Sequence, residues 1–289
     1  MLAVVGGLTI DILSGRKAIG GPPWYAGIAA ASLSQNVSVY SAVGEDFPET
    51  FTALMQQRRL NISGVKKIVG AKTYTFEHKY INGARVSRIA AEGPHIPLDI
   101  LEDFDDDTAL LSPVYREAGE KHLRLLRKNV SLLAADLQGF VRKIDRRGLI
   151  TLWSPDISEV LKTVDVLHCS EEEALAVTGE GDLISATRVL GLGTDAVVLV
   201  GSVQGLFIAH RSSLTLLRIK TDANDLTGAG DMLTGFYLAL YQKSANHLEA
   251  AAHALRHLSN ALHNPPPDRV KPTLRRPPSK IEHVWTRTL

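Results

Sequence analysis

The sequence predicts an α/β fold with a mostly parallel sheet, and three segments near its start carry this prediction. The run LAVVGG at residues 2–7 is apolar and closed by glycines, as is typical of a strand buried on both faces. The segment PPWYAGIAAASLSQN then predicts a helix from about Trp24 to Leu33, since proline is favoured in a first helical turn. VSVYSAVG at residues 37–44 is the next strand. Strand, helix and strand in this order form a βαβ unit with parallel strands.

The later part of the chain continues this alternation. Strands are expected in TALLSP, SLLAADLQG, VDVLHCS and DAVVLVG, and helices near residues 116–128, 171–178 and 182–192. No internal repeat or low-complexity linker divides the chain, so one domain over residues 1–289 is expected. Its 289 residues, 45% of them hydrophobic, are enough for a large core.

Residues 68–93 have a different pattern, which predicts an inserted antiparallel ribbon. Tyr74, Phe76 and His78 alternate with polar residues, and Asn82-Gly83 is a strong hairpin signal. Such a ribbon would cover one end of the sheet, together with the loop at residues 11–20.

The charge balance and the cysteine content indicate which binding partners and which cellular compartment to expect. The formal net charge is +1, from 32 basic and 31 acidic residues, so no global field favours nucleic acid or an anionic membrane. The single cysteine, Cys169, excludes an internal disulfide and is expected as a small buried side chain. There is no basic leader segment and no apolar run near the roughly 20 residues of a membrane helix. A cytoplasmic protein is therefore expected.

Three charged or histidine-rich segments could be metal or docking sites, but each is better explained as surface. LEDFDDDTALL at residues 101–111 holds five acids in a contiguous run, which is typical of a solvated loop. The Pro- and Arg-rich tail after Asn264 is expected to lie on the surface and to end in a short helix. A third segment is a helix expected to point four histidines into solvent, opposite its apolar stripe: His247, His253, His257 and His263.

The stretch NDLTGAGDMLTGFYLAL at residues 224–240 carries the strongest chemical signal. Gly228 and Gly230 allow a tight turn with bared N–H groups, and the helix that starts there adds its positive dipole end. This combination predicts an anion site. A carboxylate such as Asp231 would repel a bound phosphate, so its place in an anion site needs a separate explanation. The explanation that fits is a base that accepts a proton from an attacking hydroxyl. The plainer explanation of Asp231 is a helix cap.

Four motifs in order resemble the ribokinase-like (PfkB) carbohydrate kinases. DLTGAGD at residues 225–231 is similar to the family signature Asp-Thr-Thr-Gly-Ala-Gly-Asp, and GGPPWYAGIAAASLS is similar to its first signature. SAVGEDFPE resembles the Val-Gly-x-Asp segment, and VVGGLTID resembles the first strand with its substrate aspartate. The resemblance spans nearly the whole chain. It implies a three-layer αβα sandwich with a mostly parallel central sheet and a small antiparallel β lid.

The resemblance also assigns roles to individual residues. Asp231 would be the catalytic base, and the N–H groups of Gly228, Ala229 and Gly230 would form the anion hole. Asp11 would hold substrate hydroxyls, with Gly20 and Gly21 beside it, although Asp11 could instead cap a turn. On the nucleotide side the resemblance implies three residues: Gly201, Gly205 and Thr227.

Departures from the family pattern affect the metal and the substrate. The usual Asn-x-x-Glu motif reads SEEE, so Glu173 keeps the acid while Ser170 stands where Asn is usual. Glu173 would then reach Mg²⁺ only through water. Leu199 replaces a threonine on the nucleotide strand, and Tyr25 stands where many sugar kinases have a substrate-binding Asn.

A narrower resemblance points to the substrate. LLSPVYREAG followed by LLAADLQGFVRKID is similar to the archaeal myo-inositol kinase branch, which also has a Tyr at the position of Tyr25. On this resemblance Gln138 and Arg142 contact the substrate, unless the segment is only a surface turn. An ATP-dependent kinase acting on a polyol or sugar, first of all myo-inositol, is thus expected, with Mg²⁺ arriving on the ATP.

Other functions stay open at this point. A nucleoside kinase of the same fold would need an aromatic wall, for which Trp24, Tyr25 and Phe76 are candidates. A sugar-binding regulator without catalysis is a third possibility, against which the intact Gly-Ala-Gly-Asp argues. Dinucleotide and P-loop motifs are absent from the sequence. The ribbon has a free edge, so a homodimer through the lid is also expected.

Overall fold

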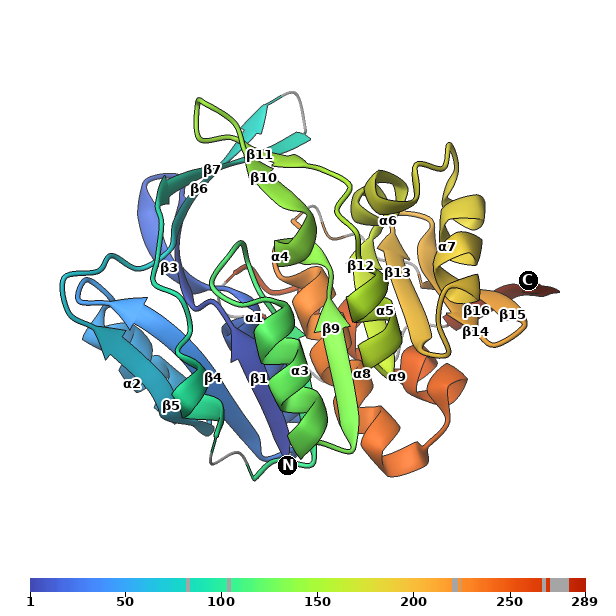
Figure 1. Ribbon diagram of the computed structural model, residues 1–289, viewed down its shortest axis with the longest axis horizontal. Coiled ribbons are helices and arrows are strands. Elements are labelled where there is room, and N and C mark those ends of the chain that lie inside the picture. The colour runs from blue at the N-terminus through green and yellow to red at the C-terminus, as the bar shows by residue number, and fades with distance from the viewer. Residues whose placement is uncertain (82–83, 103–104, 220–222, 224, 267–268, 271–280) are drawn as a thin grey trace.

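Parallel strands at the centre of the molecule are covered by helices on both faces (Figure 1). The computed structural model describes residues 1–289 except 82–83, 103–104, 220–222, 224, 267–268 and 271–280. Within these residues, ten strands form the central sheet in the order β16-β15-β14-β13-β12-β9-β8-β1-β4-β5. Pairing is parallel from β13 to β5 and antiparallel from β13 to β16.

The described strands are β1 (Leu2–Gly6), β2 (Thr9–Leu13), β3 (Arg16–Gly20), β4 (Val37–Gly44), β5 (Leu60–Ile68), β6 (Thr75–Ile81), β7 (Ala84–Ala91), β8 (Thr108–Ser112), β9 (Leu132–Asp136), β10 (Arg142–Ile144), β11 (Ile150–Leu152), β12 (Val166–Ser170), β13 (Val197–Ser202), β14 (Gly205–His210), β15 (Ser213–Ile219) and β16 (Ile281–Thr288). The helices are α1 (Pro22–Ser32), α2 (Glu49–Gln57), η1 (Leu98–Leu101, a 3₁₀ turn), α3 (Glu120–Asn129), α4 (Gln138–Val141), α5 (Ser158–Thr163), α6 (Glu171–Thr178), α7 (Leu183–Leu192), α8 (Ala229–Ser244) and α9 (His247–Leu262).

Two apolar cores fill the space between the sheet and its helices. Side chains of α1, α2, α8 and α9 pack on one face, and those of α3, α5, α6 and α7 pack on the other. Helices α1 and α8 approach closely, and the approach requires glycine at position 235. A Cβ on Gly235 would lie 2.3 Å from the carbonyl oxygen of Ala26. This contact fixes the first turns of both helices, which carry Tyr25 and Asp231, relative to each other. The predicted αβα sandwich is confirmed.

A second, four-stranded sheet lies across one end of the molecule in the order β3-β2-β6-β7. Residues 11–20, expected as a loop, form most of the β2–β3 hairpin. The sheet is mixed and not purely antiparallel, since β2 pairs in parallel with β6. The Asn82-Gly83 turn lies outside the described residues, but β6 and β7 on either side of it pair antiparallel as expected.

The short β10–β11 hairpin joins this second sheet at the edge of β7. The N–H of Ile89 donates to the carbonyl of Gly148 at 2.9 Å, and Arg88 forms a bridge with Leu149. The upper part of Figure 1 shows β10 and β11 beside β6 and β7. The β6–β7 and β10–β11 hairpins, which are far apart in the chain, therefore cover the same end of the central sheet.

The end of the chain was expected to form a short helix, and this prediction is wrong. Residues Ile281–Thr288 form β16, which pairs antiparallel with β15 at the sheet edge. Trp285 places its ring edge-on to Phe207 at 6.1 Å between centroids, and Arg287 lies over the indole at 4.7 Å. These contacts favour a strand, because alternate side chains reach the sheet's apolar face.

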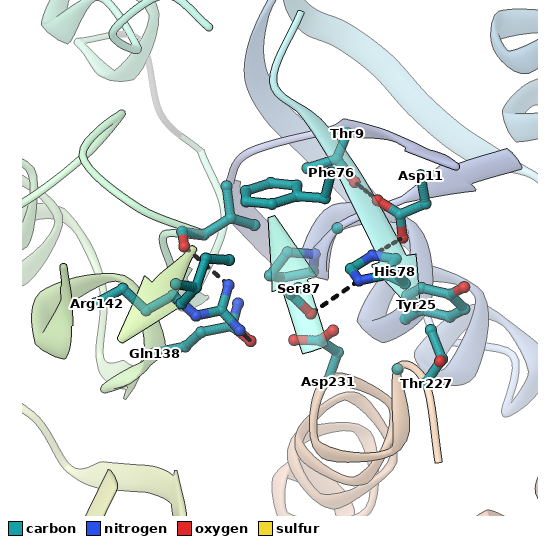
Figure 2. A pocket seen from close by; sticks show the side chains of 15 residues that line it. Thr9, Asp11, Tyr25, Phe76, His78, Ser87, Gln138, Arg142, Thr227 and Asp231 are labelled. Carbon is teal, nitrogen blue, oxygen red and sulfur yellow. Dashed lines mark hydrogen bonds and ion pairs between the residues drawn. The ribbon is translucent and has the colours of Figure 1, made fainter. Parts of the chain in front are cut away.

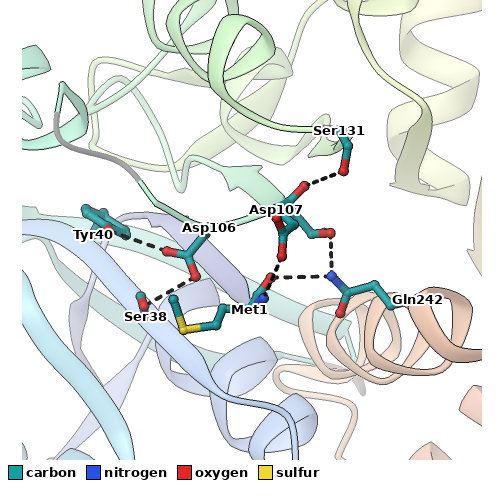
Figure 3. A network of polar contacts seen from close by, with 8 residues as sticks. Met1, Ser38, Tyr40, Asp106, Asp107, Ser131 and Gln242 are labelled. Atoms are coloured by element: carbon teal, nitrogen blue, oxygen red, sulfur yellow. Dashed lines mark hydrogen bonds and ion pairs between the residues drawn. The ribbon is translucent and has the colours of Figure 1, made fainter.

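The acidic segment at residues 101–111 is only partly solvated. Asp106 is buried and accepts hydrogen bonds from the hydroxyls of Ser38 and Tyr40, each at 3.5 Å (Figure 3). The carboxylate of Asp107 lies 3.3 Å from the N-terminal amine of Met1. These aspartates thus anchor the start of β8 to its neighbours.

The histidines of α9 are half-buried and not solvated as expected. His257 stacks on Phe236 with 5.4 Å between ring centroids, and His247 meets His210 edge-on at 4.3 Å. Among the described residues, no cluster of three His, Cys, Asp or Glu side chains could hold a metal ion. No helix in the same part of the chain is long and apolar enough to cross a membrane.

Candidate active site

A pocket opens where the second sheet and the β10–β11 hairpin face the first turn of α8 (Figure 2). Eight residues that the sequence assigned to a site line it: Asp11, Gly21, Tyr25, Gln138, Arg142, Thr227, Gly228 and Asp231. They come from β2, the start of α1, α4, the start of β10, and α8 with the segment leading into it. Open α/β sheets bind ligands at the carboxyl ends of their strands, and this pocket lies in that place.

The start of α8 has the geometry of an anion site. Gly228 is the N-cap with φ 74°, and a Cβ there would lie 2.5 Å from the ring of Tyr25, so glycine is required. The N–H of Met232 donates to the Gly228 carbonyl at 2.9 Å and begins the helical pattern. The N–H of Ala229 donates to the Leu226 carbonyl at 3.0 Å and is thus already satisfied. Gly228, Gly230 and Asp231 are the better donors for an anion.

Asp231 is placed to act as a base in this pocket. Its side chain projects from the first turn of α8 into the space beneath His78 and Ser87 (Figure 2). Burial and the carboxylates of Asp136 and Glu173 raise the pKa of Asp231 to about 7, against the opposing charges of His168 and Arg142. A carboxylate with this pKa takes a proton from a hydroxyl more effectively than an ordinary aspartate does.

Asp11 lies in β2, across the pocket from Asp231, and is held by two neighbours. The hydroxyl of Thr9 donates to its Oδ1 at 2.7 Å, and Nε2 of His78 lies 3.6 Å from its Oδ2. A Cβ on Gly20 would come within 2.2 Å of that same Oδ2, so glycine leaves the room that the carboxylate occupies. His78 is in turn fixed by Ser87, whose Oγ lies 2.9 Å from its Nδ1.

Gln138 and Arg142 form a second polar group across the pocket (Figure 2). Arg142 donates to the Gln138 side-chain oxygen at 2.7 Å and to the Val114 carbonyl at 3.0 Å. The loop that carries the Val114 carbonyl is held by Glu117. The buried carboxylate of Glu117 accepts hydrogen bonds from the N–H groups of Val114 and Tyr115 at 2.6 and 3.0 Å. Arg142 occupies one acceptor site of the Gln138 oxygen, so Gln138 still offers a ligand its NH₂ group and the second acceptor site of that oxygen.

Between the two polar ends the pocket wall is apolar. Phe76, Val114 and Ile150 line it. The ring of Phe76 lies nearly parallel to that of His78 at 6.3 Å, in a row along β6. Trp24, a candidate for an aromatic wall, is wholly buried in the core and does not line the pocket. Tyr25 and Phe76 do line it.

Six predicted residues do not line this pocket: Gly20, Ala229, Gly230, Gly201, Gly205 and Glu173. The first three are neighbours of lining residues in the sequence, and the other three lie in β13, β14 and α6. Gly201 packs against the His168 ring. Gly205 has φ 137° and a Cβ there would be 2.4 Å from the Leu217 carbonyl oxygen, so its position is explained by the β13–β14 turn. Glu173 is buried, and its Oε2 accepts from the Ser170 N–H at 2.9 Å in a capping box. A water-mediated role of Glu173 toward Mg²⁺ stays a prediction.

Several site residues were not singled out from the sequence. Thr9, Ser87 and Ile150 line the pocket without a motif, and His78 was noted only as part of an alternating strand. Asp136 and His168 form a buried pair at 2.6 Å next to Asp231. A lone histidine within the apolar run VDVLHCS was the one sequence signal for that pair.

Comparison with known proteins relates this geometry to kinases. No family model matches the chain. A cytidine kinase from Thermococcus kodakarensis is 29% identical over 259 residues, which cover 84% of this chain and 88% of that protein. A pyrophosphate-dependent kinase in the ribokinase family, solved with a pyrophosphate analogue and myo-inositol, superposes with a TM-score of 0.77 at 20% identity, covering 90% of this chain and 94% of the other. Ribokinase from Arabidopsis thaliana, complexed with ribose and ATP, gives 0.70 at 18% identity, with 91% and 92% covered.

The chain has the ribokinase-like fold. The resemblance to ribokinase-like (PfkB) carbohydrate kinases that the motifs carried is confirmed, since these matches are kinases and extend over most of both chains. In this ribokinase-like fold the Gly-Ala-Gly-Asp motif and the Asp11 strand face one another across the pocket, although more than 200 residues separate them in the sequence.

Proposed function

We propose that this protein transfers a phosphoryl group to a hydroxyl of a nucleoside, with cytidine as the first candidate. One observation carries the proposal: an apolar wall with an aromatic ring separates two polar ends of the pocket. A nucleoside has a matching division into a sugar rich in hydroxyls and a flat base with polar edges. The 29% identity to a cytidine kinase supports the same substrate class.

The proposed orientation follows from the side chains. The carboxylate of Asp11, oriented by Thr9 and His78, accepts hydrogen bonds from vicinal ribose hydroxyls. The base lies along Phe76, and the NH₂ group of Gln138 donates to an acceptor on its edge. The hydroxyl to be phosphorylated then faces Asp231, which removes its proton as it attacks the phosphorus.

The donor is proposed to bind at the N-terminus of α8. The N–H groups there and the helix dipole stabilise negative charge on the transferring phosphoryl group, an effect worth roughly 3–4 kcal/mol for each well-aimed donor. ATP is the proposed donor, with Mg²⁺ held by its phosphates and by water, because the described residues offer no carboxylate cluster for a metal. Mg²⁺ bound in this way would neutralise phosphate charge.

A polyol is the second candidate acceptor. The pyrophosphate-dependent kinase solved with myo-inositol has the same fold, and the Gln138–Arg142 pair suits vicinal hydroxyls as well as a base edge. The apolar wall argues against a polyol, because a ring with a hydroxyl on each carbon would face Phe76, Val114 and Ile150 without polar partners.

The experiment that tests the proposal is a matrix of acceptors and donors. Purified protein is incubated with cytidine, adenosine, myo-inositol, ribose, fructose or 2-keto-3-deoxygluconate, each with Mg-ATP or Mg-pyrophosphate, and phosphorylated product is measured by mass spectrometry. Turnover of nucleosides, lost in an Asp231→Asn control that still binds the donor, supports the proposal. Turnover confined to myo-inositol would replace the nucleoside with the polyol, and silence with every pair would reject the kinase function.

A further inference from the structure

A buried histidine lies directly beneath the anion site. His168 is in β12, and its ring fills the space between Gly230 at the start of α8 and Gly201 in β13. A Cβ on Gly230 would lie 2.9 Å from its Cε1, and one on Gly201 would lie 3.6 Å from its Nε2. A Cβ at Gly230 would therefore displace the imidazole, whereas one at Gly201 would only make van der Waals contact with it.

Asp136 fixes the orientation of this ring. Its Oδ2 lies 2.6 Å from Nδ1 of His168, and both side chains are about 95% buried. Its other oxygen, Oδ1, accepts the N–H of Gln138 at 2.9 Å. The same carboxylate therefore connects the ring beneath α8 to the first residue of α4, on the acceptor side of the pocket.

The remaining nitrogen of the ring has no partner in the described part of the chain. Nε2 of His168 is buried and makes no hydrogen bond there. With Nδ1 facing a carboxylate, Nε2 points away from Asp136, toward the gap between Gly201 and Gly230. A buried polar group without a partner is costly, so this one has a reason other than packing.

We infer that Asp136 and His168 form a positioning pair for phosphoryl transfer, which fixes a buried positive charge beneath the first turn of α8 and thereby favours the ionised form of Asp231. This inference rests on the proposed kinase function. His168 does not touch the acceptor, because it does not line the pocket. It acts through Asp231 and through the helix N-terminus above it.

The charges around the pair are consistent with this role. Burial alone would lower the pKa of His168, but the carboxylates of Asp136, Glu173 and Asp231 outweigh it and raise that pKa. Arg142 is the other cation that lowers the pKa of Asp231. Three carboxylates thus share two cations, and removal of His168 would leave Arg142 alone to favour the charged form of Asp231.

The test compares pH profiles of kcat/KM for wild type, His168→Gln and His168→Lys. Glutamine removes the charge, so the acid limb should move to higher pH; for a pKa rise of about one unit, activity falls ~5- to 10-fold at pH 6.5 and less than twofold at pH 9. Lysine restores a cation and should bring the limb back toward the wild-type position. His122→Gln is the matched control, since His122 is also buried but lies in α3, with its ring against the carbonyl of Ile96.

The outcomes separate this inference from the proposed function. If wild type is active and His168→Gln has the wild-type acid limb, the inference is overturned while the kinase function stands. If wild type is silent, the kinase function fails, and imidazole ¹⁵N NMR decides the state of His168, its signal assigned by its loss in His168→Gln. A titration midpoint above the ordinary value of about 6.5 supports the fixed positive charge, and a lower one overturns it.

Discussion

Nε2 of His78 lies 3.6 Å from the carboxylate of Asp11, so β2 and β6, neighbouring strands of the second sheet, are linked by their side chains at the acceptor end of the pocket. The two residues are diagonal neighbours across the β2–β6 pair, where Asp11 stands opposite Phe76 and Leu13 stands opposite His78. Because both side chains are only 6% exposed, water competes little with their interaction. Asp11 is therefore oriented before any ligand arrives.

Changing Asp11 to Asn should weaken acceptor binding more than donor binding. A hydrogen bond to a charged group contributes about 1.5–3 kcal/mol, so the KM for the acceptor should rise by ~10- to 100-fold, while the KM for the donor changes less than twofold. Steady-state kinetics with each substrate varied in turn measure both values. Asp105→Asn, at an exposed position, is the control. Equal increases in both KM values would contradict an acceptor-side role.

The activity of the wild-type protein should depend on the ionisation of Asp231. The active form of a general base is the carboxylate, and its pKa is raised to about 7. kcat/KM should then rise about tenfold per pH unit below pH 7 and level off above it. A pH–rate profile from pH 5.5 to 9 measures this. A flat profile would show that the rate-limiting step does not use the Asp231 carboxylate.

Gln138→Ala should raise the KM for the acceptor more than that for the donor. The side chain offers its NH₂ group to the pocket, and its loss also releases one hydrogen bond of Arg142. A loss of about 1–2 kcal/mol corresponds to ~5- to 30-fold in acceptor KM. Gln56→Ala, on the exposed side of α2, should change neither value. An effect confined to the donor would move Gln138 out of the acceptor site.

Phe76→Leu distinguishes a nucleoside from a sugar as the natural acceptor. Loss of the ring removes stacking worth about 0.5–1.5 kcal/mol, so the KM for cytidine should rise ~2- to 10-fold. The KM for ribose, which has no base, should stay within twofold. Phe51→Leu in α2 is a matched change far from the pocket, where the ring meets Phe47. Identical responses of cytidine and ribose would argue against a base-binding wall.

Gly205→Ala tests whether this glycine serves the donor or the fold. With φ at 137° and the Leu217 carbonyl 2.4 Å from a new Cβ, the substitution should lower the free energy of unfolding by about 1–3 kcal/mol. Thermal unfolding and the KM for ATP are measured together. Gly181→Ala is the control, because a Cβ there meets no atom within 4 Å. A lower Tm with unchanged KM means a structural role, whereas a raised KM would support the predicted nucleotide contact.

The parts of the site that the sequence predicted are those encoded by local backbone chemistry. Gly228 and Asp231 stand at a glycine turn before a helix, where the residues themselves set the conformation. The direction of Trp24 was not predictable, because α1 is buried from Pro22 to Ala30 and its pattern does not distinguish one face from another. The parallel β2–β6 pairing and the strand β16 depend on partners more than 60 residues away.

The pairing of His168 with Asp136 was also beyond the sequence. Asp136 ends one apolar strand and His168 lies within another, and each alone suggests an ordinary loop or core residue. The two strands become neighbours only in the folded sheet, where His168 stands opposite Asp136 in register. Long-range strand order thus creates a polar contact that no spacing in the sequence reveals.

The bond between Ile89 and Gly148 makes the roof of the pocket a single arch built from two separate stretches of chain. A ligand that orders Phe76 on one side also restrains Ile150 and Arg142 on the other, because the two stretches share a hydrogen-bonded seam. Amide hydrogen exchange in residues 75–81, 84–91 and 142–152 should therefore slow together when an acceptor binds. Discrimination between acceptors then depends on cooperative ordering of both stretches. An acceptor that fits one of them poorly leaves both more dynamic.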